Sequence, residues 1–252
     1  MFFRPKYSII IPTRDEEESI GKVLCSIPNE IRKKSEIIVV DSSTDYTPII
    51  AKKLGARVII EKRKGKGNAI RTGVNASRGN ILIFLDGDGT DPPQYIPKLL
   101  LKLKKSNLVL GCRSSKSFKN DDLTMRRIFK LYGISIRLIF RIVGLKVGDP
   151  LAGFRAIRRS DWDKLNLKSK GFEIETEMNL KALDKEFDIR QVSIPHFKRG
   201  GGLMKSKLIS NPRSWFKIIN FVLRYVEKKK ISNRIKKIRQ ALKSNLRNNS
   251  II

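Results

Sequence analysis

The chain is poor in acidic residues, in cysteine and in histidine. Only 24 of its 252 residues are acidic against 54 that are basic, so the formal net charge is +30 at pH 7. A charge of this size implies a polyanionic neighbour, and nucleic acid and anionic lipid both qualify. The single histidine, His196, excludes a histidine metal cluster. Cys25 and Cys112 each sit in an apolar segment without metal-ligand spacing, so we expect buried free thiols, no disulfide and a reducing, cytoplasmic setting.

Long apolar runs are also missing. A membrane-spanning helix needs about 20 mostly apolar residues. Residues 126–146 are dense in Ile, Leu, Phe and Tyr, but they contain six basic residues and no acid. This composition favours a helix that lies at an interface or lines a groove. The first six residues lead straight into a predicted strand, without the apolar core and cleavage site of a signal peptide, so we expect no export signal.

The order of the predicted elements indicates the fold class. Hydrophobic residues make up 40% of the chain, which is enough for one large domain with a tail. Strands are predicted at 7–12, 36–40, 57–60, 81–85, 108–111 and 189–195, and helices at 13–27, 48–54, 69–76, 93–105 and from 171 onward. Strand and helix thus alternate four times in the first 112 residues. This alternation predicts an α/β fold with a central, mostly parallel sheet and helices on both faces.

The most informative stretch runs from Ile81 to Pro93. Five apolar residues, typical of a strand buried on both faces, end abruptly in Asp86, Gly87 and Asp88. Ligands bind at the carboxyl edge of such sheets, so the two aspartates form a candidate clamp for a divalent cation that holds a diphosphate. The alternative is that Asp86 and Asp88 only shape a turn. For Asp91 we accept the structural interpretation, in which it caps a helix that begins near Pro92.

Other strand ends carry further candidates. Asp41 ends a strand and has no capping role, because Thr44 or Asp45 can cap the next helix. The acids at 16–18 could serve only to complement the helix dipole in a first turn, which is the structural alternative to a role in a site. The basic, glycine-containing loop 61–68, which includes Lys66, could cradle phosphate through its amides, although it lacks the spacing of a Walker loop.

The second half contributes three more segments. Asp149 and Arg155 bracket a turn of small residues. The structural alternative to a functional role is a turn with a surface ion pair, which contributes little to stability. The basic, glycine-rich loop 196–207 could fold over an anion, while for His196 we favour a packed or hydrogen-bonded role. Residues 228–252 carry nine basic residues and no acid, with apolar residues at helical spacing. That tail could dock on the domain, coil against a partner or lie on a membrane.

Five of these motifs together resemble the family-two glycosyltransferases. They are residues 11–17, 40–47, 84–88, 149–155 and the pair Ser206-Lys207, in this order. Within the family, the dolichyl- or polyprenyl-phosphate sugar synthases are the most similar. The resemblance covers residues 7 to 210 and implies a nucleotide-diphospho-sugar transferase (GT-A, Rossmann-like) fold. We accordingly expect a catalytic domain at 1–210 and a basic amphipathic helical tail at 211–252.

The resemblance also implies an inverting hexosyltransferase that uses Mg²⁺ or Mn²⁺ and a nucleotide-sugar donor of the GDP-mannose or UDP-glucose type. The nucleotide-sugar site would comprise Pro12, Arg14, Glu16, Asp41, Lys66, Asp86 and Gly87, with Asp86 and Asp88 at the metal. The catalytic residues would be Asp88, Asp149 and Arg155, and the acceptor phosphate would face Arg155, Arg199, Ser206 and Lys207. The chain departs from the family pattern at Arg14, often tyrosine, at Val40, often aspartate, and at Thr90, often a glutamine that helps ligate metal.

The acceptor separates the remaining hypotheses. A polyprenyl or dolichyl phosphate is already anionic and needs no general base, whereas a hydroxyl acceptor needs one, with Asp149 as first candidate and Glu175 behind it. The leading hypothesis is transfer to the lipid phosphate by a peripheral protein on the cytoplasmic face of the cell membrane, beside anionic lipid. The remote alternative is a non-enzymatic nucleic-acid-binding protein, which the net charge of +30 alone suggests. Against it, the acids gather at strand ends, where a phosphate backbone is repelled, and no recognition motif is present, so we expect no nucleic-acid partner.

Overall fold

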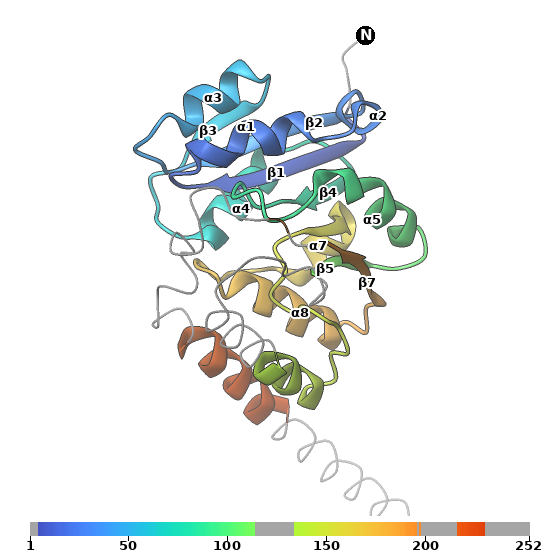
Figure 1. Ribbon diagram of the computed structural model, residues 1–252. Helices are drawn as coiled ribbons and strands as arrows, with labels where there is room; N and C mark the ends of the chain where they lie inside the picture. Colours follow the sequence, from blue (N-terminus) through green and yellow to red (C-terminus); the bar gives the residue numbers. More distant parts are fainter. Residues whose placement is uncertain (1–4, 114–133, 196, 198–215, 230–252) are drawn as a thin grey trace, which may run out of the picture.

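The computed structural model describes residues 5–113, 134–195, 197 and 216–229. Its seven-stranded sheet has the order β3-β2-β1-β4-β6-β5-β7 (Figure 1). The strands are β1 (Tyr7–Thr13), β2 (Ser35–Asp41), β3 (Arg57–Ile60), β4 (Ile81–Phe84), β5 (Leu108–Arg113), β6 (Arg155–Arg158) and β7 (Ile189–Ile194). Neighbouring strands are parallel except at β6, which is antiparallel to both β4 and β5. The predicted α/β fold with a mostly parallel sheet is confirmed.

Helices cover both faces of this sheet. They are α1 (Glu17–Cys25), α2 (Asn29–Arg32), α3 (Thr47–Lys53), α4 (Lys66–Ala76), α5 (Ile96–Leu103) after the 3-10 turn η1 (Pro93–Tyr95), α7 (Arg159–Leu165) and α8 (Ile174–Asp184). Figure 1 shows α1 and α3 on one side of β1 and α4 and α8 on the other. Helices α2 and α7 and strand β6 were not predicted. Strand β6 is short and has arginine at both ends, so its apolar signal is only the buried pair Ala156 and Ile157.

Two hydrophobic cores meet at the sheet. Ile9 and Ile11 of β1 pack with α1, α3 and α5, while Ile10 packs with α4, α7 and α8. Successive side chains of a strand point to opposite faces, so a strand between two helical layers is apolar throughout. This is why the strands were readable from the sequence. Of the two free cysteines, Cys112 is buried as expected, but Cys25 at the end of α1 is exposed, which corrects that expectation.

The parallel register gathers three loops at one edge. Thr13 at the end of β1 lies opposite Asp41 at the end of β2, and Ile10 lies opposite Phe84 at the end of β4. The N–H of Leu85 donates to the carbonyl oxygen of Ile10 at 3.2 Å. The segments after β1, β2 and β4 therefore leave the sheet side by side, as the sequence pattern predicted.

Residues 134–142 and 216–229 form two helices below α8 in Figure 1. Phe140 and Val222 join the core that α4 and α8 share, and the hydroxyl of Tyr225 donates to Asp184 Oδ1 at 2.7 Å. The first part of the predicted tail thus packs on the domain, while the boundary at 210 stays a prediction. Within the described ranges, no helix is both long enough and apolar enough to cross a membrane. The rest of the predicted interfacial helix and of the basic tail lies outside those ranges.

Candidate active site

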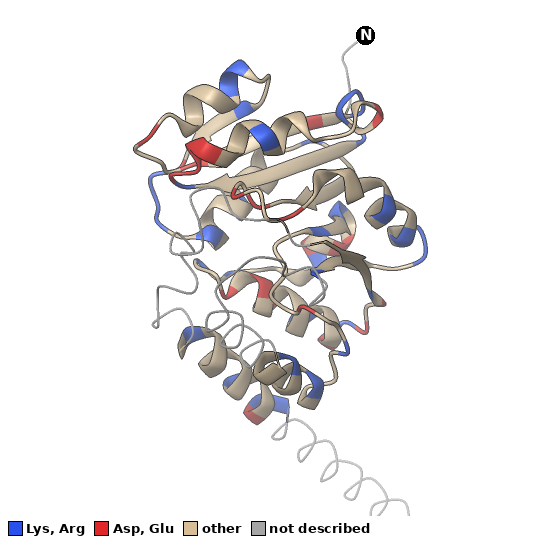
Figure 2. Ribbon diagram, in the orientation of Figure 1, with Lys and Arg blue, Asp and Glu red and all other residues tan. Residues whose placement is uncertain are grey.

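The loops after β1 and β2 hold each other at the carboxyl edge. The N–H of Asp15 donates to Ser43 Oγ at 2.7 Å, and Asp15 Oδ1 accepts from the N–H of Thr44 at 2.9 Å. The N–H of Glu16 donates to Thr47 Oγ1 at 2.9 Å. These bonds fix the start of α1 against the start of α3, and Figure 2 shows acidic residues gathered at the start of α1.

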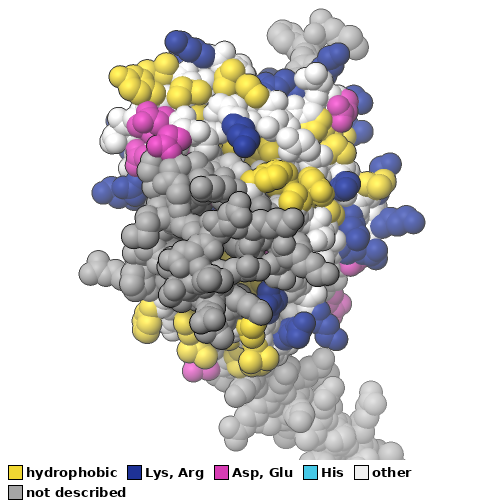
Figure 3. Space-filling view, in the orientation of Figure 1, with side chains coloured by type: hydrophobic (Ala, Val, Ile, Leu, Met, Phe, Trp, Pro, Cys, Tyr) yellow, Lys and Arg dark blue, Asp and Glu magenta, His cyan; other side chains and the backbone are white. Residues whose placement is uncertain are grey.

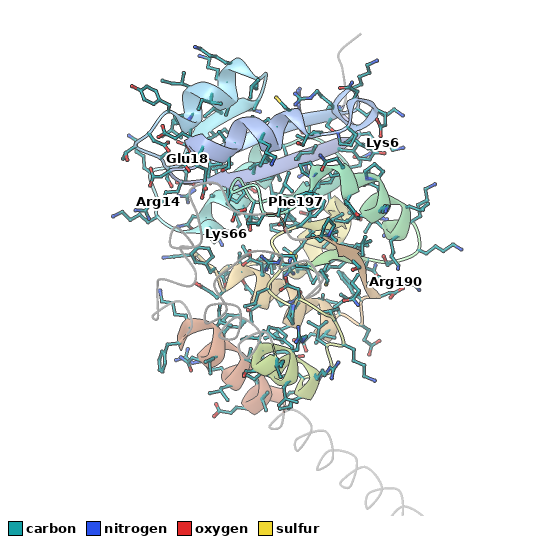
Figure 4. All side chains as sticks on the ribbon, in the orientation of Figure 1. Lys6, Arg14, Glu18, Lys66, Arg190 and Phe197 are labelled. Atoms are coloured by element: carbon teal, nitrogen blue, oxygen red, sulfur yellow. The ribbon has the colours of Figure 1, made fainter. Side chains whose placement is uncertain are left out.

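Three of the predicted donor-site residues lie at the end of β1 or in the loop that follows it. Pro12 and Glu16 are half-buried, and Arg14 is exposed with Nε 3.7 Å from Asp15 Oδ2. Figure 4 shows Arg14 and Lys66 near the end of β1, with Lys6 at its beginning. The structure therefore brings these residues to the predicted edge. Their contact with a nucleotide sugar stays a prediction.

Asp41 is a buried anchor of the second loop. Its Oδ1 accepts from Thr13 Oγ1 at 2.7 Å and from Ser43 Oγ at 2.6 Å, while its Oδ2 accepts from the N–H of Ser43 at 3.0 Å. The residue is 1% exposed. Asp41 does not cap α3, as expected, but its carboxylate forms the turn that begins the loop, a local role that the sequence analysis did not predict. Its proposed contact with the nucleotide is untested.

The loop after β4 is held tightly against β1 and α1. Ser19 Oγ donates to the carbonyl oxygen of Gly87 at 2.7 Å, and a Cβ at position 87 would lie 2.6 Å from Thr13 Cγ2. Glycine is needed there for close approach. Asp88 Oδ1 accepts from the N–H of Thr90 at 2.9 Å and from its Oγ1 at 2.7 Å, and Asp88 is 5% exposed. Asp88 thus shapes a turn, as the structural alternative held, and Thr90 orients its carboxylate.

Asp91 does not cap a helix, which corrects the sequence interpretation. The 3-10 turn η1 that follows has no side-chain cap, and Asp91 is 3% exposed. Burial raises the pKa of Asp91 to about 7; the Arg113 guanidinium opposes this rise, and the carboxylates of Asp86, Asp88 and Asp149 add to it. Asp91 therefore belongs to the acidic site, although the sequence analysis gave it only a structural role.

Lys66 links the loop after β4 to α8. Its Nζ lies 2.6 Å from Asp86 Oδ1 and 2.7 Å from Glu175 Oε1. The Lys66 side chain is 13% exposed, against 26% for Asp86 and 5% for Glu175. Burial disfavours the ammonium, but the two carboxylates outweigh it and raise the pKa of Lys66 above its ordinary value. The prediction that Lys66 belongs to the site is supported by this geometry, which joins it to Asp86.

Backbone amides of loop 61–68 are already engaged. The N–H groups of Gly67 and Asn68 donate to the carbonyl oxygens of Gly171 and Lys170, at 3.2 and 3.1 Å. A Cβ on Gly67 would lie 2.2 Å from the carbonyl oxygen of Ser169. The amides of Gly67 and Asn68 cannot also cradle a phosphate, and the glycines allow α4 to pack against 169–171. A phosphate cradle formed by the other amides of this loop stays a prediction.

Arg155 is buried and holds the turn at 149–155 in place. Its Nε donates to the carbonyl oxygen of Ala152 at 2.6 Å, its Nη2 to that of Pro150 at 2.8 Å, and its Nη1 to Asn179 Oδ1 at 2.6 Å. The residue is 1% exposed. Arg155 therefore ties the turn 149–155 to α8, and its assignment as a catalytic, phosphate-facing residue is corrected, because all three nitrogens are buried and engaged.

Asp149 forms an ion pair that the sequence analysis missed. Its Oδ2 lies 2.6 Å from Arg113 Nε, and the two side chains are 18% and 31% exposed. Burial works against the guanidinium, but the carboxylates of Asp149 and Asp91 raise the pKa of Arg113. The sequence could have indicated Arg113, because this residue ends β5 and so lies at the same carboxyl edge of the sheet. The turn at 149–155 therefore holds a partly exposed ion pair, but its arginine is Arg113 and not Arg155.

Three predicted acceptor-site residues cannot be placed. Arg199, Ser206 and Lys207, together with His196, lie outside the described residues. Close to them in sequence, the N–H of Phe197 donates to the carbonyl oxygen of Thr90 at 3.0 Å. The chain after β7 therefore reaches the loop after β4, and Figure 4 shows Phe197 near that loop.

The donor set at this edge fits a hard divalent cation that is shared with a substrate. In the parts of the chain that the structure describes, no group of three or more His, Cys, Asp or Glu side chains is arranged to hold a metal ion. Mg²⁺, however, is commonly held by one or two carboxylates with water and substrate phosphates completing its shell. Asp86 and Asp88 supply such carboxylates at the end of one strand.

The mostly parallel sheet carries an Asp-Gly-Asp loop at the carboxyl end of β4, the arrangement that the resemblance to the family-two glycosyltransferases implies. The family model "Glycosyl transferase family 2" matches residues 8–165, and the chain belongs to this family. It is an enzyme of the glycosyltransferase type, which contradicts the alternative of a non-enzymatic protein.

Curated relatives agree with this assignment. A "Dolichyl-phosphate hexose transferase" of Haloferax volcanii is 31% identical over 196 residues, covering 77% of this chain and 84% of the relative. A "Dolichol-phosphate mannosyltransferase" of Pyrococcus furiosus is 31% identical over 188 residues, covering 70% of this chain but only 53% of the relative. The chain thus spans about half the length of the second protein.

Solved structures show the same fold. The glucosyl-3-phosphoglycerate synthase of Mycobacterium tuberculosis with phosphoglyceric acid has a TM-score of 0.70 at 24% identity, covering 88% of this chain and 80% of that one. The same enzyme with Mn²⁺, UDP and phosphoglyceric acid has a TM-score of 0.69, covering 88% and 78% of the two chains. The predicted GT-A fold is confirmed.

Proposed function

We propose that this glycosyltransferase moves a hexose from a nucleotide diphosphate to the phosphate of a polyprenyl or dolichyl lipid, with inversion at the anomeric carbon. The observation that carries the choice of acceptor is the Arg113–Asp149 ion pair at 2.6 Å. This pair engages one carboxylate oxygen of Asp149, the first candidate for the base that a hydroxyl acceptor requires, whereas an anionic acceptor phosphate needs no base. The names of the two curated relatives support the same acceptor class.

The chemistry needs negative charge to be stabilised on the departing diphosphate. A divalent cation, Mg²⁺ or Mn²⁺, supplies this stabilisation when bound, and Asp86 and Asp88 are the residues that would hold it. Thr90 orients the carboxylate of Asp88, and the carboxylate of Asp86 is paired with Lys66 in this structure. Arg113, which is partly exposed, supplies a fixed cation at the same edge. The structural neighbour with Mn²⁺ and UDP supports a metal-dependent donor site.

A hydroxyl acceptor is the second candidate. One observation favours it, namely that the pKa of Asp91 is about 7, which suits a general base near neutral pH. Glu175, the other base considered, is paired with Lys66. For a hydroxyl acceptor, Asp91 is therefore a better candidate for the base than Asp149.

We also propose that the protein works on an anionic membrane surface. The helix at 134–142 exposes Ile134, Leu138 and Ile142, and the helix at 216–229 exposes Phe216, Ile219 and Leu223. Figure 3 shows hydrophobic side chains along the lower edge of the molecule, where these two helices lie in Figure 1. Each Lys or Arg near an anionic leaflet contributes about 1 kcal/mol, and the net charge is +30. Burial of these apolar side chains in the membrane and attraction between the basic residues and anionic lipid therefore both favour membrane binding.

The test is a panel of donors and acceptors given to the full chain with Mn²⁺ or Mg²⁺. UDP-glucose, GDP-mannose and related donors are each paired with a polyprenyl phosphate, a polyprenol and phosphoglycerate. The proposal predicts transfer to the polyprenyl phosphate and none to the polyprenol of equal chain length. Transfer to the polyprenol or to phosphoglycerate, but not to the lipid phosphate, would establish the hydroxyl-acceptor candidate or a soluble acceptor instead.

A further inference from the structure

The ammonium of Lys66 is paired with Asp86 Oδ1, an atom that the proposed metal site requires. Its Nζ lies 2.6 Å from Oδ1 of Asp86, a normal charge-assisted hydrogen-bond distance. A carboxylate oxygen that is engaged by an ammonium at this distance cannot at the same time accept a metal ion from the same direction. Either Lys66 or Asp86 has to move before Oδ1 becomes a ligand.

Asp86 cannot move towards the turn at 149–155. A Cβ at Gly153 would lie 2.4 Å from Asp86 Oδ2 and 2.7 Å from Oδ1, so the turn at 149–155 passes directly beside this carboxylate. Lys66, by contrast, is the first residue of α4 and has a long, flexible stem. The group that yields is therefore the lysine.

Glu175 is placed to keep the lysine at the site when it leaves Asp86. Its Oε1 lies 2.7 Å from Lys66 Nζ, and its side chain is 5% exposed. Its carbonyl oxygen also accepts from Arg155 Nη1 at 3.3 Å, so the position of the residue is tied to the buried arginine. A lysine anchored on a fixed carboxylate can turn towards a new anion without entering bulk water.

We propose that Lys66 is an internal counter-cation that masks Asp86 until a nucleotide diphosphate arrives, and that Glu175 is the positioning residue that retains Lys66 during the exchange. The diphosphate takes Lys66 as its own partner and thereby releases Asp86 for the metal. Nucleotide and metal then bind cooperatively, and by linkage the coupling is reciprocal. This inference rests on the proposed donor site and is independent of the acceptor.

The test measures binding and not turnover. Mn²⁺ affinity is measured by electron paramagnetic resonance with and without saturating UDP or GDP, for the full chain and for Lys66→Met. The variant should bind Mn²⁺ alone more tightly, by a factor in the range of about 5 to 150 that is typical of such couplings, and should lose the same factor from the nucleotide–metal coupling. Lys62→Met, an exposed lysine of the same segment, removes the same charge and should change neither quantity.

A general change in electrostatic potential predicts a different result. Removal of a nearby positive charge would tighten Mn²⁺ binding equally with and without nucleotide, leaving the coupling unchanged. An unchanged coupling, or Mn²⁺ affinity no higher than in the wild type, overturns the proposal. Wild-type protein that binds neither UDP nor GDP under any metal condition would overturn the proposed donor use, and this inference with it.

Lys66→Met leaves two carboxylates without their shared cation, which can prevent folding. If Lys66→Met does not fold, the double variant Lys66→Met, Glu175→Gln replaces it, because it also removes the buried charge of Glu175. The same rise in affinity for Mn²⁺ alone and the same loss of coupling are expected from it. If the double variant shows wild-type coupling, Lys66 does not mask Asp86.

Discussion

Gly153 stands directly behind the carboxylate of Asp86. A Cβ at this position would lie 2.4 Å from Oδ2, 2.7 Å from Oδ1 and 2.7 Å from Cγ of Asp86. The turn at 149–155 therefore does more than connect elements, because it sets the position of one of the two carboxylates proposed to hold the metal. The absence of a side chain at residue 153 is what allows this approach.

Gly153→Ala should weaken Mn²⁺ binding while the protein still folds. Forcing a methyl group into an occupied space costs about 1–3 kcal/mol, and this cost falls on the position of Asp86. We expect Mn²⁺ affinity, measured in the presence of nucleotide, to fall by roughly five-fold or more. Gly21→Ala is the matched control, because a Cβ there would meet only ordinary contacts at 3.6 and 3.8 Å, and it should leave Mn²⁺ affinity unchanged. Equal affinity in Gly153→Ala and the wild type would contradict the assignment of Asp86.

Thr90 should tune the metal site through Asp88. Its hydroxyl donates to Asp88 Oδ1 at 2.7 Å, so Thr90→Val removes one hydrogen bond of about 0.5–1.5 kcal/mol without changing side-chain size much. We expect a several-fold loss in Mn²⁺ affinity, with the thermal midpoint lowered only slightly. Thr90→Ser restores the hydroxyl and should restore affinity, as calorimetric titration can show. If serine fails to rescue, the methyl group of Thr90 matters and its hydroxyl does not.

Asp91 should make the metal-free protein less stable at alkaline pH. Burial raises its pKa to about 7 in the folded state from an ordinary value of 3.8, so the folded state binds more protons between these pH values. The stability from this group is full below the lower pKa and is lost as pH rises through about 7. Asp91→Asn should therefore gain thermal stability over the wild type at about pH 8 and less, or none, at about pH 4.

Differential scanning calorimetry in a chelator measures this difference. Asp163→Asn, an exposed aspartate on α7, is the control and should show no such pH-dependent gain. A variant that is destabilised more at the higher pH than at the lower one would mean that Asp91 is held as a carboxylate by its neighbours.

The strands β1, β2 and β4 were predictable because burial on both faces makes them largely apolar, and the carboxyl edge then followed from parallel order. Arg155 was misassigned because burial of a guanidinium beneath a turn leaves no local pattern. Asp91 was misassigned because an acid before Pro-Pro is typical of a cap. Contacts between distant segments, such as Gly153 with Asp86, have no signature in one sequence.

The exposed stripes on the helices at 134–142 and 216–229 should drive vesicle binding. Leu138 is 59% exposed and Leu223 56%, and burying a leucine contributes about 1.5–3 kcal/mol. Leu138→Ser with Leu223→Ser should weaken binding to anionic vesicles at least about tenfold in sedimentation. Binding should also weaken as salt rises from roughly 0.1 to 0.5 M.

The matched control is Leu101→Ser. Leu101 is 66% exposed but lies on α5, away from both stripes, so its replacement should leave vesicle binding unchanged. Equal loss from Leu101→Ser, or no loss from the double variant, would show that these helices are not the attachment surface.

The central claim is that the acceptor atom is a lipid phosphate oxygen, and the linkage in the product tests it most directly. The product made from a radiolabelled nucleotide sugar and a polyprenyl phosphate is extracted into organic solvent and treated with mild acid. A hexosyl phosphate diester releases its sugar under these conditions, while a glycoside of a hydroxyl is stable. The account predicts an acid-labile product with one phosphorus per hexose and inverted anomeric configuration. An acid-stable product, formed equally well from the polyprenol, would contradict it.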